Sequence, residues 1–132
     1  MRIVLDTNIV IDLMRGDESL KKGIELLIQK GVEVFIDPIV LCELYQVAHL
    51  SDKPTQGVQK INNFLSSVDV LDFNKAACMI FGQQVAYLQK QGKPTEVLDL
   101  MIGCIAITHN ASLVTRNSKD FKHICGLKVI GY

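Results

Sequence analysis

The sequence predicts an α/β domain in which helices cover both faces of a largely parallel sheet of four to five strands. Strand-like apolar runs alternate with helix-like segments along the whole chain, which is the order of successive parallel βα units. The first run, Ile3-Val4-Leu5, is apolar without interruption, as expected for a strand buried on both faces. The 132 residues show no repeat and no linker, so we expect a single domain over 1–132.

Five segments have the composition of strands, and the segments between them have the periodicity and end signals of helices. The expected strands are 3–5, 32–36, 68–73, 113–115 and 127–130. The expected helices are 9–14, 19–30, 38–50, 54–66, 74–91, 95–109 and 118–124.

The helix boundaries follow from capping residues. Ser19 is expected to cap the second helix, and Gly31 lies just past its end. Asp37 precedes Pro38, which places a capping carboxylate before a proline at the first helical position. Asn74 is expected to cap the long helix that follows the third strand.

Composition excludes two broad classes of protein. The chain has 14 basic and 14 acidic residues and is 48% hydrophobic. Disorder requires low hydrophobicity and high net charge, and a polycationic nucleic-acid binder would have a strongly basic balance. The high apolar content instead indicates a buried contact with a second copy or a partner.

The cysteines and the apolar segments bear on the compartment. The four cysteines form no CxxC pair, so a zinc knuckle is not indicated, and we expect reduced, mostly buried thiols. The start of the chain lacks a secretory signal, and the most apolar stretch, 98–107, is too short to span a membrane. We therefore expect a cytoplasmic protein.

Asp6 directly follows the first strand, at the edge of the sheet where function gathers in open α/β folds. Thr115, Arg116 and Asn117 end another buried strand and are expected at the same edge. The segment Asp6-Thr7-Asn8 is equally compatible with an ordinary helix cap. Both interpretations stay open on this segment alone.

Glu43 lies between Ile39 and Val47 at helical spacing, on the stripe expected to face the core. A carboxylate there is unfavourable unless it is paired, hydrogen-bonded or bound to a metal ion. The alternative is a side chain at the edge of the stripe that reaches water or a lysine.

Asp99 lies in a segment, 98–107, that is apolar on nearly every face and is therefore expected to be buried. The helix dipole stabilises a carboxylate near the helix N-terminus by up to ~1 kcal/mol. Since this does not offset the burial of an unpaired charge, a cation or hydrogen-bond donors must lie nearby. Asp120 is less informative, because Asn117 and Asp120 also have the spacing of a capping box.

Together, Asp6, Glu43, Asp99 and Asp120 predict a site for a hard cation, Mg²⁺ or Mn²⁺. One or two such ions would activate water and stabilise the leaving oxygen in phosphodiester hydrolysis. The sequence has no GxSxG, GxxxxGK[ST] or GxGxxG motif, which argues against serine hydrolases, P-loop NTPases and dinucleotide-binding enzymes.

These four segments in this order resemble the PIN domain over essentially the full chain, with the closest match to VapC-type toxin ribonucleases of type II toxin–antitoxin modules. The resemblance implies a three-layer α/β/α sandwich, a Mg²⁺- or Mn²⁺-dependent endoribonuclease and a homodimer. It also implies a small antitoxin that blocks the site and binds operator DNA, so that contact with DNA is indirect.

The resemblance also assigns residues. Asp6, Glu43 and Asp99 match the family's three most regular catalytic, metal-binding acids. Asp120 is the natural match for the fourth, although Asn117 stands where other PIN proteins carry an acid. Thr115 matches a supporting hydroxyl residue. Arg116 is a candidate contact to substrate phosphate, and exposure to bulk water is the alternative.

Two other functions remain as alternatives. A receiver-like, Mg²⁺-binding signalling domain would carry adjacent acids after its first strand, whereas Asp6 is followed by Thr7. A catalytically silent PIN-like binding module would not need the full set of core acids, all of which are present.

Overall fold

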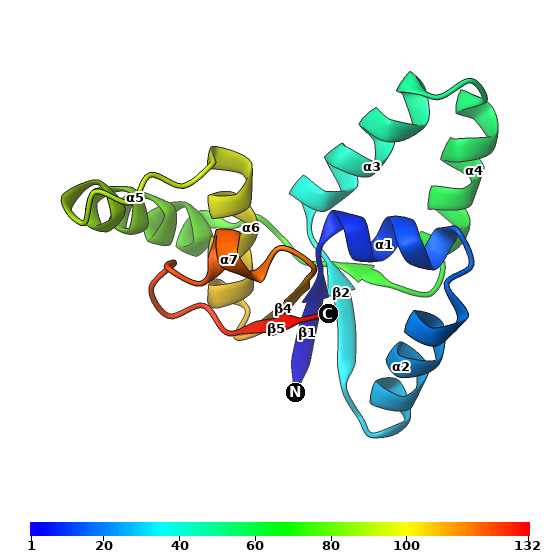
Figure 1. Ribbon diagram of the computed structural model, residues 1–132, viewed down its shortest axis with the longest axis horizontal. Helices are drawn as coiled ribbons and strands as arrows, with labels where there is room; N and C mark the ends of the chain where they lie inside the picture. The colour runs from blue at the N-terminus through cyan, green and yellow to red at the C-terminus, as the bar shows by residue number, and fades with distance from the viewer.

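The computed structural model describes residues 1–132 and contains a five-stranded sheet in the order β3-β2-β1-β4-β5 (Figure 1). All neighbouring strands are parallel. The strands are β1 (Arg2–Leu5), β2 (Glu33–Ile36), β3 (Asp69–Val70), β4 (Ser112–Thr115) and β5 (Val129–Gly131). The helices are α1 (Thr7–Met14), α2 (Glu18–Gln29), α3 (Pro38–Leu50), α4 (Pro54–Leu65), α5 (Lys75–Lys90), α6 (Val97–Thr108) and α7 (Ser118–Phe121).

The strand order divides the helices between the two faces of the sheet. The chain moves outward from β1 through β2 to β3, then returns to β4 on the other side of β1 and continues to β5. Because crossovers between parallel strands are right-handed, the helices of these two directions lie on opposite faces. Figure 1 shows α1–α4 on one side of the sheet and α5–α7 on the other. The predicted three-layer α/β/α sandwich is confirmed.

The core lies around the two central strands. Ile3, Val4 and Leu5 of β1 are fully buried, and all four residues of β4 are buried. Helix α6 packs against β4 and is buried along most of its length, from Leu100 to Ala106. The central strands β1 and β4 are thus buried on both faces of the sheet, as predicted.

Three expectations are wrong in detail. The cap of α2 is Asp17, whose side chain accepts a hydrogen bond from the Leu20 backbone N–H, and not Ser19. β3 is limited to Asp69–Val70, because only these residues pair with the edge of β2. Of the four cysteines, all of which are free, only Cys104 is buried. The other three have apolar neighbours in the sequence, but their own side chains lie on exposed faces or turns.

No helix in the structure is both long enough and apolar enough to cross a bilayer.

The cap of α3 is as predicted, but its environment is unusual. Oδ1 of Asp37 accepts a hydrogen bond of 2.9 Å from the Val40 backbone N–H, and the residue has no exposed surface. Its Oδ2 atom is buried without any hydrogen-bond partner. Burial raises the pKa of the Asp37 carboxyl to about 7, and the negative charges of Asp6 and Glu43 add to the effect of burial. The fold therefore favours the protonated form of this cap.

Replacing Asp37 by asparagine should keep the cap and remove this titration. The wild-type carboxyl ionises near 3.8 when unfolded and near 7 when folded. Its contribution to stability is therefore complete below about pH 4 and is lost as the pH rises to 7. Between pH 5 and 8, in EDTA, the wild type should lose about 2 kcal/mol of unfolding free energy relative to Asp37→Asn.

Urea unfolding at the two pH values measures this difference. The exposed acid Asp52, replaced by asparagine, is the matched control and should follow the wild type. Parallel pH profiles for Asp37→Asn and the wild type would contradict the assignment of this titration to Asp37.

Candidate active site at the carboxyl edge of the sheet

The site begins where the two central strands end. β1 and β4 pair in parallel with Leu5 opposite Val114, so the next residues, Asp6 and Thr115, lie side by side at the carboxyl edge. Thr115 Oγ1 donates a hydrogen bond of 2.7 Å to Asp6 Oδ2. Thr115 is fully buried, and Asp6 is 7% exposed. The sheet register therefore fixes the first acid of the site.

Both oxygens of Asp6 have donors. Oδ1 accepts a hydrogen bond of 2.8 Å from the Thr7 backbone N–H, and Asp6 is also the N-cap of α1. Thr115 Oγ1, which donates to Oδ2, itself accepts a bond of 3.0 Å from the Asn117 backbone N–H. The two interpretations of Asp6 are thus compatible, since one carboxylate begins the helix and faces the site.

Glu43 is joined to Asp6 through Thr7. The Thr7 hydroxyl donates a hydrogen bond of 2.7 Å to Glu43 Oε1, across from α1 to α3. Burial raises the pKa of the Glu43 carboxyl, the Thr7 bond lowers it, and the charges of Asp6 and Glu96 raise it further. Val47, on the same line of the helix, is exposed, so Glu43 lies at the edge of the buried stripe and not within it.

Asp99 enters the site from the first turn of α6. Burial raises the pKa of its carboxyl to about 6, and the charges of Glu96, Asp6, Asp120 and Glu43 raise it in that order. The negative charges of all three other predicted acids thus act on Asp99. The structure places Asp6, Glu43, Asp99 and Asp120 in one electrostatically coupled group around this carboxyl.

Asp120 is the most exposed member of the group. It lies in the first turn of the short helix α7, which follows β4. Asn117 is the N-cap of α7, but its side chain makes no capping hydrogen bond. The capping-box alternative for Asn117 and Asp120 is therefore not formed, and the Asp120 carboxylate makes no hydrogen bond or ion pair elsewhere.

Three residues that touch this group were not among the predicted site residues. Thr7 links Asp6 to Glu43. Its position next to Asp6 in the Asp6-Thr7-Asn8 motif could have identified it as a site residue. Glu96 caps α6 by accepting a bond of 3.0 Å from the Asp99 backbone N–H. Asp37 was assigned only as a cap, although β1 and β2 pair with Val4 opposite Phe35, which places Asp37 beside Asp6.

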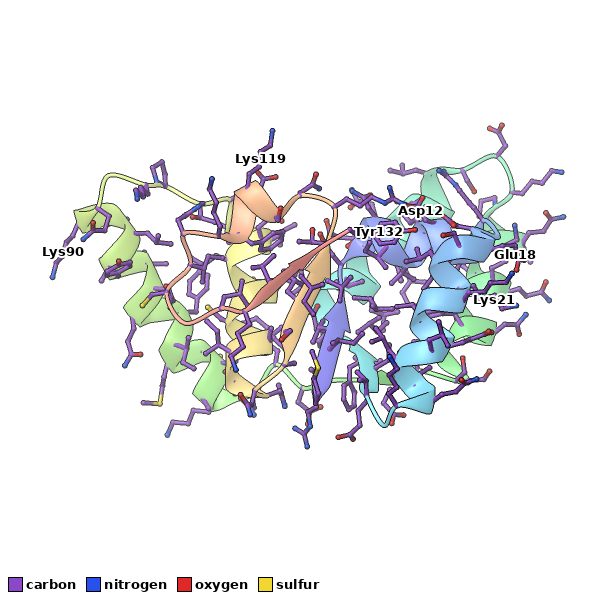
Figure 2. The ribbon with its side chains drawn as sticks, turned by 60° about the horizontal axis from the view of Figure 1, so that its bottom comes forward. Asp12, Glu18, Lys21, Lys90, Lys119 and Tyr132 are labelled. Carbon is purple, nitrogen blue, oxygen red and sulfur yellow. The ribbon has the colours of Figure 1, made fainter.

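Arg116 is exposed to solvent, and its guanidinium also contacts three side chains. Its Nε atom lies 2.7 Å from Asp12 Oδ2, and Nη2 lies 3.7 Å from Asp17 Oδ2. Its guanidinium carbon lies 4.6 Å from the centre of the Tyr132 ring, and Figure 2 shows Asp12 and Tyr132 together on this side of the sheet. A phosphate contact by Arg116 would have to compete with these partners.

The donor set suits a hard divalent cation. Carboxylate oxygens are the ligands that Mg²⁺ and Mn²⁺ prefer. The pKa values of Glu43 and Asp99 are raised first by burial and then by neighbouring negative charges, and a bound cation would oppose both effects. No three acids, histidines or cysteines are grouped tightly enough to enclose an ion as they stand. A bound cation would therefore have to draw the carboxylates together against their repulsion.

Comparison with known proteins is consistent with this geometry. The PIN domain family model matches residues 3–127. Ribonuclease VapC2 of Rickettsia felis is 36% identical, with 96% of this chain and 95% of the relative covered. The tRNA(fMet)-specific endonuclease VapC of Shigella flexneri is 33% identical, with 97% and 96% covered.

Among solved structures, VapBC2 from Rickettsia felis, bound to a DNA fragment from its promoter, superposes with a TM-score of 0.93. The two chains are 33% identical, with 100% of this chain and 99% of the other covered. With the coupled carboxylates at the sheet edge, these likenesses identify the chain as a member of the PIN domain family, among the VapC ribonucleases.

Proposed function

We propose that this chain is a metal-dependent endoribonuclease and the toxin of a toxin–antitoxin pair. The observation that supports it most directly is the convergence of Asp6, Glu43, Asp99 and Asp120 at one edge of the sheet. Relatives named as ribonucleases and as a tRNA-specific endonuclease match the chain over nearly its full length. A receiver-like signalling domain and a catalytically silent module are not favoured by these relatives.

In this proposal, Asp6, Glu43, Asp99 and Asp120 hold one or two ions of Mg²⁺ or Mn²⁺. When bound, such ions lower the pKa of a coordinated water and stabilise the charge of the leaving 3′ oxygen. The protein's own residues orient the metal-binding acids. Thr115 and Thr7 fix the orientation of Asp6 and Glu43 through short hydrogen bonds, and the Asn117 backbone in turn holds Thr115.

The raised pKa values bear on metal binding. Without a cation, the Asp99 carboxyl changes protonation near a pKa of about 6, and the pKa of the Glu43 carboxyl is also raised. Because a metal ion binds the ionised form of a carboxyl, binding should release protons from these two acids.

We further propose a small antitoxin as partner, with contact to operator DNA only through it, because the similar Rickettsia assembly is a VapBC complex on promoter DNA. A homodimer is consistent with exposed apolar side chains such as Leu50, Met79 and Val97. The cytoplasm is the proposed compartment, since RNA and operator DNA are both found there.

Cleavage of RNA should depend on the metal and on the acids. With Mg²⁺ or Mn²⁺ the chain should cut single-stranded RNA, and EDTA should abolish the cut. Asp6→Asn and Asp99→Asn should each reduce the rate at least ~100-fold, because each removes a charged ligand. Gel electrophoresis of end-labelled RNA measures the rate.

Glu25→Gln, which neutralises an exposed acid on α2, is the control and should cleave like the wild type. Retention of full, metal-dependent cleavage by both site variants would refute the assignment of the site.

The toxin role makes a separate prediction in cells. Induced expression of the chain should arrest bacterial growth, whereas Asp99→Asn, produced at the same level, should not. A small protein encoded beside this chain should restore growth when expressed with it. Normal growth under expression of active enzyme would contradict the toxin role and leave the nuclease assignment intact.

A further inference from the structure

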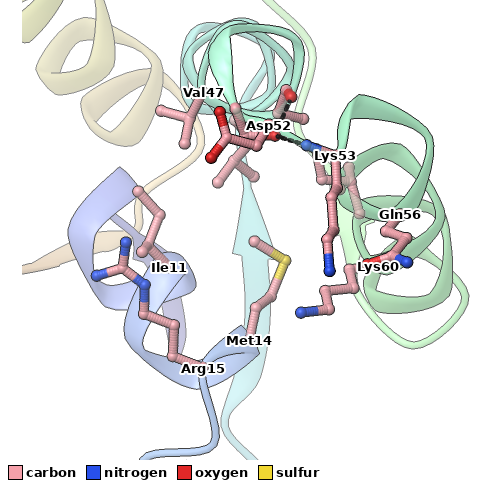
Figure 3. Close-up of a pocket in the computed structure, with 13 residues that line it drawn as sticks. Ile11, Met14, Arg15, Val47, Asp52, Lys53, Gln56 and Lys60 are labelled. Atoms are coloured by element: carbon pink, nitrogen blue, oxygen red, sulfur yellow. Dashed lines mark hydrogen bonds between the residues drawn. The ribbon is translucent and has the colours of Figure 1, made fainter.

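A polar cavity of about 560 Å³ is lined by residues that flank the site in the sequence. Its wall includes Asn8, two residues after Asp6, and Asn117, whose backbone bonds Thr115. It continues into a second cavity of about 420 Å³ between α1, α3 and α4 (Figure 3). The two cavities share Ile11, Arg15 and Val47, so they form one continuous depression, which we call the α1–α3 groove.

The groove has an excess of free positive charge. Arg15 borders both cavities and is exposed, and its guanidinium makes no ion pair. Lys53 and Lys60 line the far cavity and are also without ion pairs, against a single acid there, Asp52. Figure 3 shows both lysines on the α4 side of the cavity, across Met14 from Arg15.

Arg116 differs from these three cations. It also lines the near cavity, but its charge is already matched by Asp12 and Asp17. The cation of the near cavity that is free to meet an anion is therefore Arg15, which is the C-cap of α1 and borders both cavities. The ion pairs of Arg116 with Asp12 and Asp17 hold its side chain in the wall of the near cavity.

We propose that the α1–α3 groove binds the RNA strand on one side of the scissile phosphate, with Arg15 as the phosphate contact nearest the acids. This inference rests on the proposed nuclease function. Lys53 and Lys60 would contact phosphates further along, and Ile11, Met14 and Val47 offer an apolar floor to the bases. The groove contains no aromatic side chain for stacking, so phosphate contacts dominate.

Electrostatics favours this occupant. The acid group by itself repels a polyanion, and a strand that crosses it needs compensating cations beside the site. The groove supplies them, and its near cavity is lined by Asn8 and Asn117, which flank the site. An acidic segment of a protein partner would satisfy the same charges, and the experiment separates it from RNA.

The test measures RNA binding and cleavage by Arg15→Gln in the full-length protein. The control is Lys90→Gln, which removes one positive charge at the end of α5, at the opposite end of the molecule (Figure 2). Binding of a fluorescein-labelled, mixed-sequence single-stranded RNA of twelve nucleotides is followed by anisotropy over a salt series. All binding variants also carry Asp99→Asn, so the measurement does not depend on turnover.

Arg15→Gln should weaken RNA binding about 3–10-fold and reduce the slope of log affinity against log salt by about 0.7, the value for one lost phosphate contact. In the active background it should raise KM and leave kcat unchanged. Adding Lys60→Gln should reduce the slope again. Lys90→Gln should retain the parental slope.

Three results would overturn the inference: an unchanged affinity and slope in Arg15→Gln, an equal loss of slope in Lys90→Gln, or a loss of binding only to the co-encoded partner protein. The last result would assign the groove to the partner instead of RNA. Failure of the parent chain to cleave RNA would count against the proposed nuclease function alone, because the binding slopes are measured separately.

Discussion

The grouping of partly buried carboxylates at one edge of the sheet is the constraint on which the rest of the site depends. Asp6, Glu43, Asp99 and Asp120 come from four different elements. Burial, and after it the negative charges of neighbouring acids, raises the pKa of the Glu43 and Asp99 carboxyls. Such a group is unfavourable in an isolated protein. The buried sheet and helices keep the four acids in place despite this cost. A divalent cation bound among them would replace the repulsion by attraction.

Few interactions are needed to hold the acids in place. The register of β1 and β4 places Thr115 beside Asp6, and Thr7, the next residue after Asp6, reaches Glu43. Each threonine hydroxyl donates to a carboxylate, so the two acids are oriented without any neutralising positive charge. An arginine or lysine in these places would form salt bridges and weaken the affinity for a metal ion. Arg116, which follows β4 at this edge, is paired with Asp12 and Asp17 instead.

Much of this was accessible from the sequence, for identifiable reasons. Ile3-Val4-Leu5 and the apolar surroundings of Asp99 report burial directly, so the central strands, α6 and the two acids beside them could be predicted. Val47 and the exposed cysteines could not, because an apolar neighbourhood in sequence does not say which side of a helix faces the core. Asp37 shows the same limit, since strand register and not local pattern places it beside Asp6.

The zero net charge also has a structural explanation. If the four site acids are set aside with bound metal, 14 basic residues remain against 14 − 4 = 10 acidic ones. The balance of +4 is not spread evenly, since Arg15, Lys53 and Lys60 lie unpaired along the groove beside the acids. A neutral chain can thus present a negative site for a cation and a positive path for a polyanion within the same edge of the fold.

The most direct test of carboxylate repulsion relieved by metal is the number of protons released when Mn²⁺ binds. Calorimetric titration of the metal-free protein in buffers of different ionisation enthalpy gives this number at each pH. With the pKa of Asp99 at about 6, binding at pH 6 should release about half a proton or more. Release should fall toward zero at pH 8, and Asp99→Asn should lose most of the release at pH 6. Absence of Mn²⁺ binding, or equal proton release at both pH values, would contradict this account.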